Sequence, residues 1–434
     1  MKSGLSRWSG LGVMWMFSAL VTACGGGGDS GAAPAISNLS VLPTAVYNTI
    51  DPLTFSSQFD FRDSDGNVST LTQKVRSEAD GSVVDLGTIP IVGIEGLASG
   101  TVFGAFMASG VPSGTYTVLV HVTDSTALQS NELGATIRIA DYPWTNRLAG
   151  PTPREHAAAA VLDGKIYLAG GQRTDAGVEP GPATAIMEVY DPASDTWSAA
   201  TPMPTARMGL TLSTYNGRLY AIGGRTDGYS NSATGAVEIY NPATNLWTSG
   251  TSMTTPRYHA AAAVTASFMG DLIMVAGGES ADTVLTTVEG YRPAANAWIG
   301  LAPLPAARGR LALAGIPGQL FAVGGHAGAV TQWVGTVDAY DPLMDVWTGR
   351  TPMPTPRGHL ALTAIEGQLL AAGGESALGS LDVLERYDPI TNSWRTLTPS
   401  QTAFTRAAAA VVDTRMHVLG RLLSLRYDPA NEIR

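Results

Sequence analysis

Arginine recurs six times at nearly equal intervals in the last two thirds of the chain, and histidine follows three of these arginines two positions later. The arginines are Arg154, Arg207, Arg257, Arg308, Arg357 and Arg406, and the histidines are His156, His259 and His359. A guanidinium binds carboxylates and phosphates through paired hydrogen bonds, and an imidazole can bind metal ions. The two residue types together indicate a site for an anionic ligand or for a metal ion.

A structural role for the arginines competes with this interpretation, because an acidic residue recurs two positions before a repeated tyrosine. The acids are Glu188, Glu238, Glu289, Asp338 and Glu385. A repeated ion pair between strands is the simpler explanation, and it would add specificity more surely than stability. The sixth copy has Leu425 at the acidic position, so we expect Arg406 to be the guanidinium without a partner.

The three histidines occur in alternate repeats, and Gly209 and Arg310 occupy the same position in the repeats between them. Histidines with this spacing would lie roughly three-fold around a central channel. Three imidazoles could bind a metal ion. No carboxylate recurs with them in the sequence, so we expect neither a metal nor another cofactor.

Variable loops follow each glycine pair of the repeat, and they carry residues that a scaffold does not require, above all Trp333. The arginines and these loops leave the strands at the same face, so we expect one ligand-binding rim. Its predicted members are Arg154, His156, Arg207, Arg257, His259, Arg308, Arg310, His326, Trp333, Arg357, His359 and Arg406. An aromatic ring beside arginine and histidine suits a sugar or an anionic group.

Sequence motifs of common enzyme classes are absent. The chain has no Gly-x-Ser-x-Gly turn, zinc-protease helix or phosphate-binding loop. The segments 278–281 and 374–377 begin like a nucleophile turn but lack its last glycine. We therefore expect a binding protein with no catalytic residues.

The elements that position these residues form a repeat, which is complete between Arg154 and Arg207. A strand of small residues (157–162), an Asp-Gly turn and an apolar strand (165–169) lead to a glycine pair; a variable loop, a strand ending in tyrosine and a turn to tryptophan follow. The tyrosines are Tyr190, Tyr240, Tyr291, Tyr340, Tyr387 and Tyr427, and the tryptophans are Trp144, Trp197, Trp247, Trp298, Trp347 and Trp394. Four short strands in each repeat predict one blade of a β-propeller. The glycine pair, the tyrosine, the tryptophan and the Pro-Met-Pro-x-x-Arg segment closely resemble the kelch repeat.

The two ends of this region complete each other. The N-terminal end (143–154) has the tryptophan and the arginine without preceding strands, and the C-terminal end (407–429) has three strands without a tryptophan. Joining them gives a sixth blade and leaves no open sheet edge. The prediction for residues 141–434 is an all-β, six-bladed kelch-type β-propeller closed by its N-terminal strand.

Residues 35–140 lack the repeat but alternate like short strands, most clearly at 114–124. Their length and strand number predict an immunoglobulin-like β-sandwich. Asp60, Asp63 and Asp65 suggest calcium, but Phe61 and Thr72 stand where an EF-hand loop needs acids, so an Asp-Gly turn is the better interpretation.

The first residues indicate export. Lys2 and Arg7 precede an apolar run (11–21), and Val21-Thr22-Ala23-Cys24 resembles the lipobox of bacterial lipoproteins, in which the cysteine is lipidated. The prediction is a signal peptide over 1–23, lipidation of Cys24 and a glycine-rich tether over 24–34. Gly25 resembles the residue after the cysteine in lipoproteins sorted to the outer membrane, facing either the periplasm or the cell surface.

Function follows from these parts as an expectation. The net charge of −10 argues against nucleic acid as a partner. We expect a monomeric, lipid-anchored envelope protein whose loop face binds a glycan or an envelope protein. The alternative is a sugar mutarotase or epimerase, because the expected architecture resembles kelch-type sialic acid mutarotases. Copper-radical oxidases with kelch-like blades need a cysteine in the propeller, which this sequence lacks.

Overall fold

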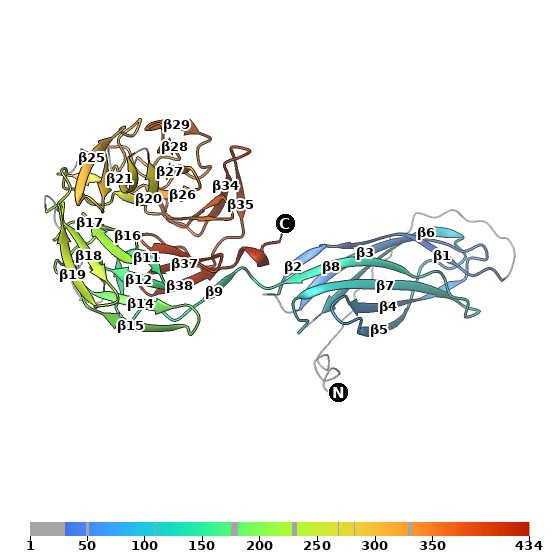
Figure 1. Ribbon diagram of the computed structural model, residues 1–434. Helices are drawn as coiled ribbons and strands as arrows, with labels where there is room; N and C mark the ends of the chain where they lie inside the picture. Colours follow the sequence, from blue (N-terminus) through green and yellow to red (C-terminus); the bar gives the residue numbers. More distant parts are fainter. Residues whose placement is uncertain are drawn as a thin grey trace. The chain divides into compact units, whose positions relative to one another are not determined.

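The computed structural model describes residues 31–48, 52–108, 110–174, 181–227, 232–267, 269–281, 283–328 and 332–433. The chain divides into two compact units, Met1–Tyr142 with Asn431–Arg434, and Pro143–Ala430 (Figure 1). The predicted signal peptide, Cys24 and most of the tether lie outside the described residues. Among the described residues, no helix has the length and apolar character needed to cross a membrane.

The first unit consists of two sheets. The three-stranded sheet has the order β1 (Ala35–Leu42), β3 (Leu53–Arg62), β6 (Ser99–Ala108). The five-stranded sheet has the order β2 (Ala45–Tyr47), β8 (Leu133–Ala140), β7 (Gly114–Asp124), β4 (Val68–Ser77), β5 (Val83–Pro90). The pair β2–β8 is parallel, and the other pairings described in these two sheets are antiparallel.

Alternating side chains from both sheets of the first unit fill one core. Phe55 and Phe59 of β3 and Val118 and Val120 of β7 are buried in the same cluster. The Asp-Gly turn predicted after β3 is present, because the Asn67 amide donates to Asp63 Oδ2 at 2.8 Å and Gly66 has a φ of 69°.

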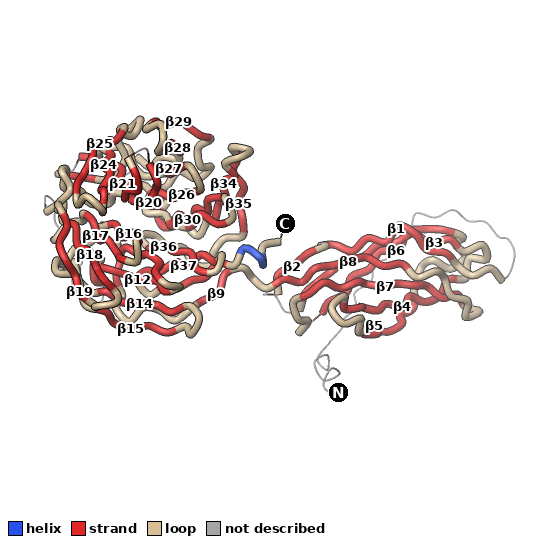
Figure 2. The backbone as a smooth tube through the Cα atoms, viewed as in Figure 1, coloured by secondary structure: helices blue, strands red, loops and turns tan. Residues whose placement is uncertain are grey.

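The described residues of the second unit form six four-stranded antiparallel sheets (Figure 2). The first three are β11 (Ala158–Leu162), β12 (Lys165–Ala169), β14 (Met187–Asp191), β15 (Thr196–Ala200); β16 (Thr211–Tyr215), β17 (Arg218–Ile222), β18 (Val237–Asn241), β19 (Leu246–Gly250); and β20 (Ala261–Ser267), β21 (Gly270–Ala276), β24 (Val288–Arg292), β25 (Ala297–Leu301). The last three are β26 (Ala312–Ile316), β27 (Gln319–Val323), β28 (Val337–Asp341), β29 (Val346–Arg350); β30 (Ala361–Ile365), β31 (Gln368–Ala372), β34 (Leu384–Asp388), β35 (Ser393–Leu397); and β36 (Ala408–Val412), β37 (Arg415–Gly420), β38 (Leu423–Tyr427), β9 (Trp144–Asn146).

Short ladders and one 3₁₀ turn complete the described secondary structure. The ladders are β10 (Arg154–Glu155) with β13 (Gln172–Arg173), β22 (Glu279–Ser280) with β23 (Thr283–Val284), and β32 (Glu375–Ser376) with β33 (Gly379–Ser380), and the turn is η1 (Pro429–Asn431).

The first strands of the six sheets surround a common axis. β11, β16, β20, β26, β30 and β36 each contact the next, and β36 contacts β11 again. The sixth sheet takes three strands from the C-terminal end and β9 from the N-terminal end, with Tyr427 opposite Trp144. This radial arrangement is a β-propeller, and each sheet is one blade.

Polar atoms of the repeated aromatic residues join each blade to the one before it. The indole N–H of each tryptophan donates to a carbonyl oxygen of the preceding blade, for example Trp247 to Thr201 at 2.8 Å and Trp144 to Thr398 at 3.0 Å. In the first five blades, an Asn or Asp two residues before the tryptophan accepts from the tyrosine hydroxyl and from a backbone amide of the preceding blade, as Asn245 does from Tyr240 and Thr201. These side chains hold neighbouring sheets at a fixed spacing. The aromatic rings therefore combine burial with specific polar contacts.

Candidate functional site

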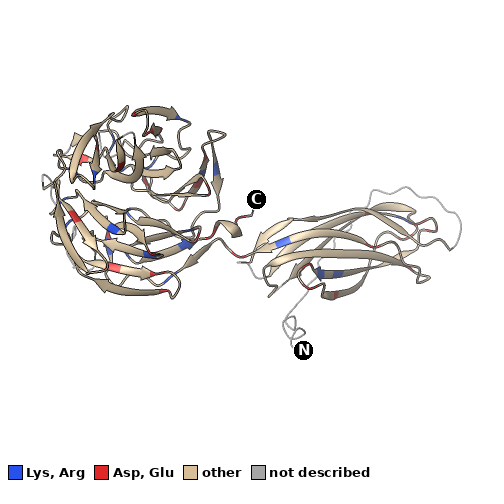
Figure 3. Ribbon diagram, in the orientation of Figure 1, with Lys and Arg blue, Asp and Glu red and all other residues tan. Residues whose placement is uncertain are grey.

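Five of the six repeated arginines are interior scaffold residues rather than members of an open rim. Arg154, Arg207, Arg257, Arg308 and Arg357 are at most 1% exposed, and each pairs with the acid of its own blade. Figure 3 colours the charged positions along the ribbon. The predicted ion pairs are confirmed, and placing these five arginines on a ligand-accessible rim is wrong because their donors are used inside the blades.

Arg207 shows how the pair is built. Its guanidinium donates to Glu238 Oε2 at 2.7 Å and to the carbonyl oxygens of Gly223, Ala236 and Ala221 at 2.9 to 3.1 Å. Burial lowers the pKa of Arg207, and the charge of Glu238 opposes that shift. The arginine thus fastens the linker that enters a blade to the second and third strands of that blade.

The linker is also held through its backbone. The amide of Gly171 donates to the carbonyl oxygen of Arg207 at 2.9 Å, and a Cβ at Gly170 would lie 2.5 Å from the same oxygen. Gly170 has a φ of 65°, which glycine adopts readily. The glycine pairs therefore permit the close approach of backbones that the repeat predicts.

The sixth blade departs from the expected register. The amide of Gly374 donates to the carbonyl oxygen of Phe404 at 2.8 Å, as Gly171 does to Arg207, so Phe404 occupies the arginine position. Both Phe404 and Leu425 are buried, and this blade has apolar residues in place of the ion pair. Arg406 therefore aligns with the histidines, two positions further along.

The residues of that position form a closed ring of backbone hydrogen bonds around the axis. Each amide donates to the carbonyl oxygen of the preceding member at 2.8 to 3.2 Å, in the cyclic order His156, Gly209, His259, Arg310, His359, Arg406 and back to His156. All six have φ between 49° and 61°. We call this set the axial ring. A Cβ at Gly209 would lie 2.6 Å from His259 Cδ2, so glycine leaves room for that imidazole.

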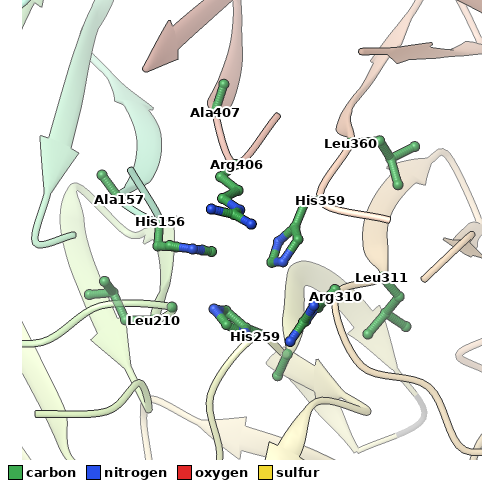
Figure 4. Close-up of a pocket in the computed structure, with 12 residues that line it drawn as sticks. His156, Ala157, Leu210, His259, Arg310, Leu311, His359, Leu360, Arg406 and Ala407 are labelled. Carbon is green, nitrogen blue, oxygen red and sulfur yellow. The ribbon is translucent and has the colours of Figure 1, made fainter. Parts of the chain in front are cut away.

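The axial ring and the residues after it line a cavity of about 120 Å³. His156, His259 and His359 converge there, with Arg310 and Arg406 beside them (Figure 4). The imidazole centroids are 4.7, 4.9 and 5.0 Å apart, and one ligand atom from each ring lies within 4.8 Å of the others. The three-fold grouping expected from alternate repeats is confirmed.

A buried carboxylate supports one of these histidines. His259 Nδ1 lies 3.1 Å from Glu279 Oε1, and Arg310 Nε and His326 Nε2 reach the same oxygen at 2.9 and 3.3 Å. Burial alone would raise the pKa of Glu279, but the hydrogen bonds from the two histidines and the charge of Arg310 lower it well below its usual range. Glu279 is therefore an anion that orients the imidazole of His259.

Desolvation keeps the ring histidines neutral. Burial lowers the pKa of His156 and His359 well below the usual value, and the neighbouring histidines and arginines add to the shift. Burial also lowers the pKa of His259, although Glu279 opposes the shift. The cavity thus presents uncharged imidazoles near neutral pH, with lone pairs available to a ligand.

Arg406 is not the guanidinium without a partner that the sequence predicts. It lies 3.2 Å from Glu155 and 3.3 Å from Glu375, and its side chain is 35% exposed. The prediction failed because it assigned Arg406 to the repeat position that Phe404 occupies. With Arg310 paired to Glu279 as well, the site has no uncompensated charge to select an anion by itself.

His326 and Trp333 lie next to the cavity without lining it. His326 is 2% exposed and bonded to Glu279. The Trp333 ring is 6.1 Å from His326 and 6.4 Å from His359, and a Cβ at Gly358 would lie 2.5 Å from it. The indole packs against Gly358, the residue before His359, which places Trp333 on the same face as the histidines as a packing residue.

Sequence reasoning missed Glu279, Glu155 and Glu375, the carboxylates around the axial ring. Glu279 and Glu375 come directly after glycine pairs, a position that also holds Gln172, Arg225 and His326. The polar character of that position was a usable signal. A search for acids at a constant distance in sequence from the histidines overlooks Glu279, because Glu279 follows the first hairpin of the blade whereas His259 precedes it.

Comparisons with known proteins agree with the fold. The family model described as the kelch motif matches residues 153–204, 206–254, 307–354 and 356–401. Kelch-like protein 31 of Danio rerio is 35% identical over 111 residues, which are 25% of this chain and 18% of that protein. Beta-scruin of Limulus polyphemus is 27% identical over 195 residues, 43% and 21% of the two chains. Kelch-like protein terF of Aspergillus terreus is 29% identical over 194 residues, 42% and 40%.

The matched segments span less than half the length of each of these relatives. Among solved structures, the one titled "Structure of YjhT" aligns with a TM-score of 0.52 and 14% identity, covering 64% of this chain and 95% of that one. At this identity the likeness concerns the fold alone. Repeat markers, sheet topology and these matches together show that the second unit carries kelch repeats and folds as a β-propeller.

Proposed function

We propose that this chain is a lipid-anchored, non-catalytic envelope protein whose propeller binds a protein partner at its loop face. The proposed architecture is a six-bladed propeller after an immunoglobulin-like spacer. The observation that carries the binding role is an open notch on the loop face between the fifth and sixth blades. Its volume is about 270 Å³, larger than that of the axial cavity.

A missing loop creates this notch. In the sixth blade only Arg421 and Leu422 connect β37 to β38, whereas residues 373–383 connect the corresponding strands of the fifth blade. Phe404, Leu422 and Leu423 are among the lining residues. The short connection leaves apolar side chains uncovered where other blades have a longer loop.

The chemistry of the notch favours a protein over a glycan. Leu422 is 71% exposed, and Leu378, in the loop of the fifth blade at the same face, is 95% exposed. Aliphatic side chains with high exposure suit the apolar residues of a protein partner. A sugar would instead be expected to stack on exposed aromatic rings, and the exposed large hydrophobic residues described in the propeller are aliphatic or methionine.

We expect Leu422→Glu and Leu378→Glu to weaken capture of an envelope protein by at least about tenfold, because each places a charge in an apolar contact. The measurement is crosslinking capture by the purified chain from an envelope extract, followed by binding assays with the captured protein. Ile390→Glu is the matched control: Ile390 is also 95% exposed but lies at the opposite end of β34. Equal capture by all three variants would contradict the proposal, and binding of glycans alone would assign the face to sugars.

The anchor is proposed from the sequence around Cys24. We expect Cys24→Ser to move the protein from the membrane fraction to the soluble fraction, because the lipid would be its hydrophobic attachment after signal cleavage. The measurement is fractionation after a salt wash, with Cys24→Ala as a second variant. A Ser variant that still sediments with membranes would refute lipid anchoring.

A second candidate, an exported sugar mutarotase or epimerase, is favoured by one feature of the axial cavity. His259 is polarised by Glu279 and could accept a proton from a sugar hydroxyl. Exchange between sugar anomers, followed by NMR with and without the protein, distinguishes this candidate, because a binding protein leaves the exchange rate unchanged.

A further inference from the structure

We propose that His156, His259 and His359 form a binding site for a divalent transition-metal ion of the zinc class in the axial cavity. Each histidine comes from a different blade, and one ligand atom from each lies within 4.8 Å of the others. The closed backbone ring fixes the three Cα positions, so the site needs no rearrangement of the chain. This inference is independent of the protein-binding notch.

The contacts of His259 are a second observation that points to a ligand. His259 Nδ1 lies 3.1 Å from Glu279 Oε1. Nε2 of the same imidazole is buried and has no hydrogen-bond partner among the described residues. A histidine with one nitrogen bound to a carboxylate and the other bare has the arrangement found in metal-ligating histidines.

The ligand set determines the kind of metal. Three imidazoles without a thiolate suit zinc, copper, nickel or cobalt, whereas magnesium and calcium prefer oxygen ligands. A tetrahedral ion with bonds of about 2.0–2.1 Å needs nitrogens about 3.3 Å apart. The ligand atoms of the three rings lie within 4.8 Å of one another, so binding would draw the imidazoles inward.

Three protein ligands leave one coordination position open to the cavity. Arg310 and Arg406 lie beside it (Figure 4), and their charges are compensated by Glu279 and by Glu155 and Glu375. Compensation by these acids limits the repulsion of a cation. The open position would hold water or a small anion within reach of the guanidinium groups.

The test is metal titration of the purified chain, using Zn²⁺ by calorimetry and Co²⁺ by visible absorption. We expect one ion per chain and the absorption band of four-coordinate Co²⁺. His156→Asn, His259→Asn and His359→Asn should each weaken binding by more than about 100-fold. Asn is chosen because it tolerates the positive φ of the axial ring better than most other residues with a side chain.

Two further variants keep the result interpretable. Glu279→Gln should weaken binding by about 10- to 100-fold because it removes a carboxylate behind a ligand. His121→Gln, in the first unit, should leave metal binding unchanged. Every variant keeps Cys24, so this residue does not differ between the samples. Thermal unfolding without metal shows which variants are folded. An absence of one-to-one binding, or the same affinity in a folded triple Asn variant, would overturn the proposal.

Discussion

Replacing Arg207 with phenylalanine is expected to destabilise the propeller by about 3–5 kcal/mol, because Glu238 would remain buried without its partner. Glu238 is 4% exposed, so water cannot replace the guanidinium. The measurement is urea unfolding followed by tryptophan fluorescence. All tryptophans after Trp15 lie in the second unit, so the signal reports the propeller.

The matched control copies the natural solution of the sixth blade. Phe404 and Leu425 occupy the arginine and acid positions there, so Arg207→Phe with Glu238→Leu reproduces that pair in the second blade. Replacing both members of a buried ion pair by apolar residues often costs little stability. We expect the double variant to recover at least half of the loss. A double variant as unstable as Arg207→Phe would show that the carbonyl contacts of Arg207 matter more than the pair.

Trp144→Ala is expected to cost about 3–5 kcal/mol, because it removes a buried aromatic side chain from the strand that completes the sixth blade. Trp144 is 6% exposed, its ring lies 5.1 Å from Tyr427, and its N–H reaches into the fifth blade. β9 has only three residues, so its ladder with β38 is short and the packing of Trp144 is a large part of their contact. The same urea unfolding experiment measures the loss.

Two control variants distinguish the loss of ring closure by β9 from the loss of buried side-chain volume. Trp144→Phe keeps the ring and removes one hydrogen bond, so it should cost about 1 kcal/mol beyond the smaller packing change. Trp247→Ala makes the same deletion in a blade formed from continuous sequence. We expect Trp144→Ala alone to increase aggregation, since it frees an edge of β38. Wild-type stability in Trp144→Ala would mean that β9 is dispensable.

The propeller could be predicted because its signals are local and repeated. A glycine pair is needed wherever the next linker crosses close behind it, and tyrosine and tryptophan recur because each pair of blades meets in the same way. The register of the sixth blade could not be read from spacing alone, because Arg406 falls at nearly the expected interval. The alanines after His156 and after Arg406 give the correct alignment.

The candidate site could be predicted only in part. The grouping of His156, His259 and His359 follows from their occurrence in alternate repeats. The support of His259 by Glu279 depends on side chains that meet between the third and fourth blades, which no local pattern reveals. The burial of Arg154 and its four counterparts could be inferred from the accompanying acids. Whether these arginines line the cavity depends on the path of each linker, which the sequence does not show.

The cyclic hydrogen bonding of the axial ring restricts how this protein can change in length during evolution. A solenoid of stacked repeats can gain one unit at either end, because its ends are free. Here the hydrogen bond from His156 to Arg406 returns to the starting point, so an additional blade would have to break that bond and narrow every angle between neighbouring blades. Duplication of a single repeat would therefore disrupt the whole circle, whereas insertions within an outer loop would leave it intact.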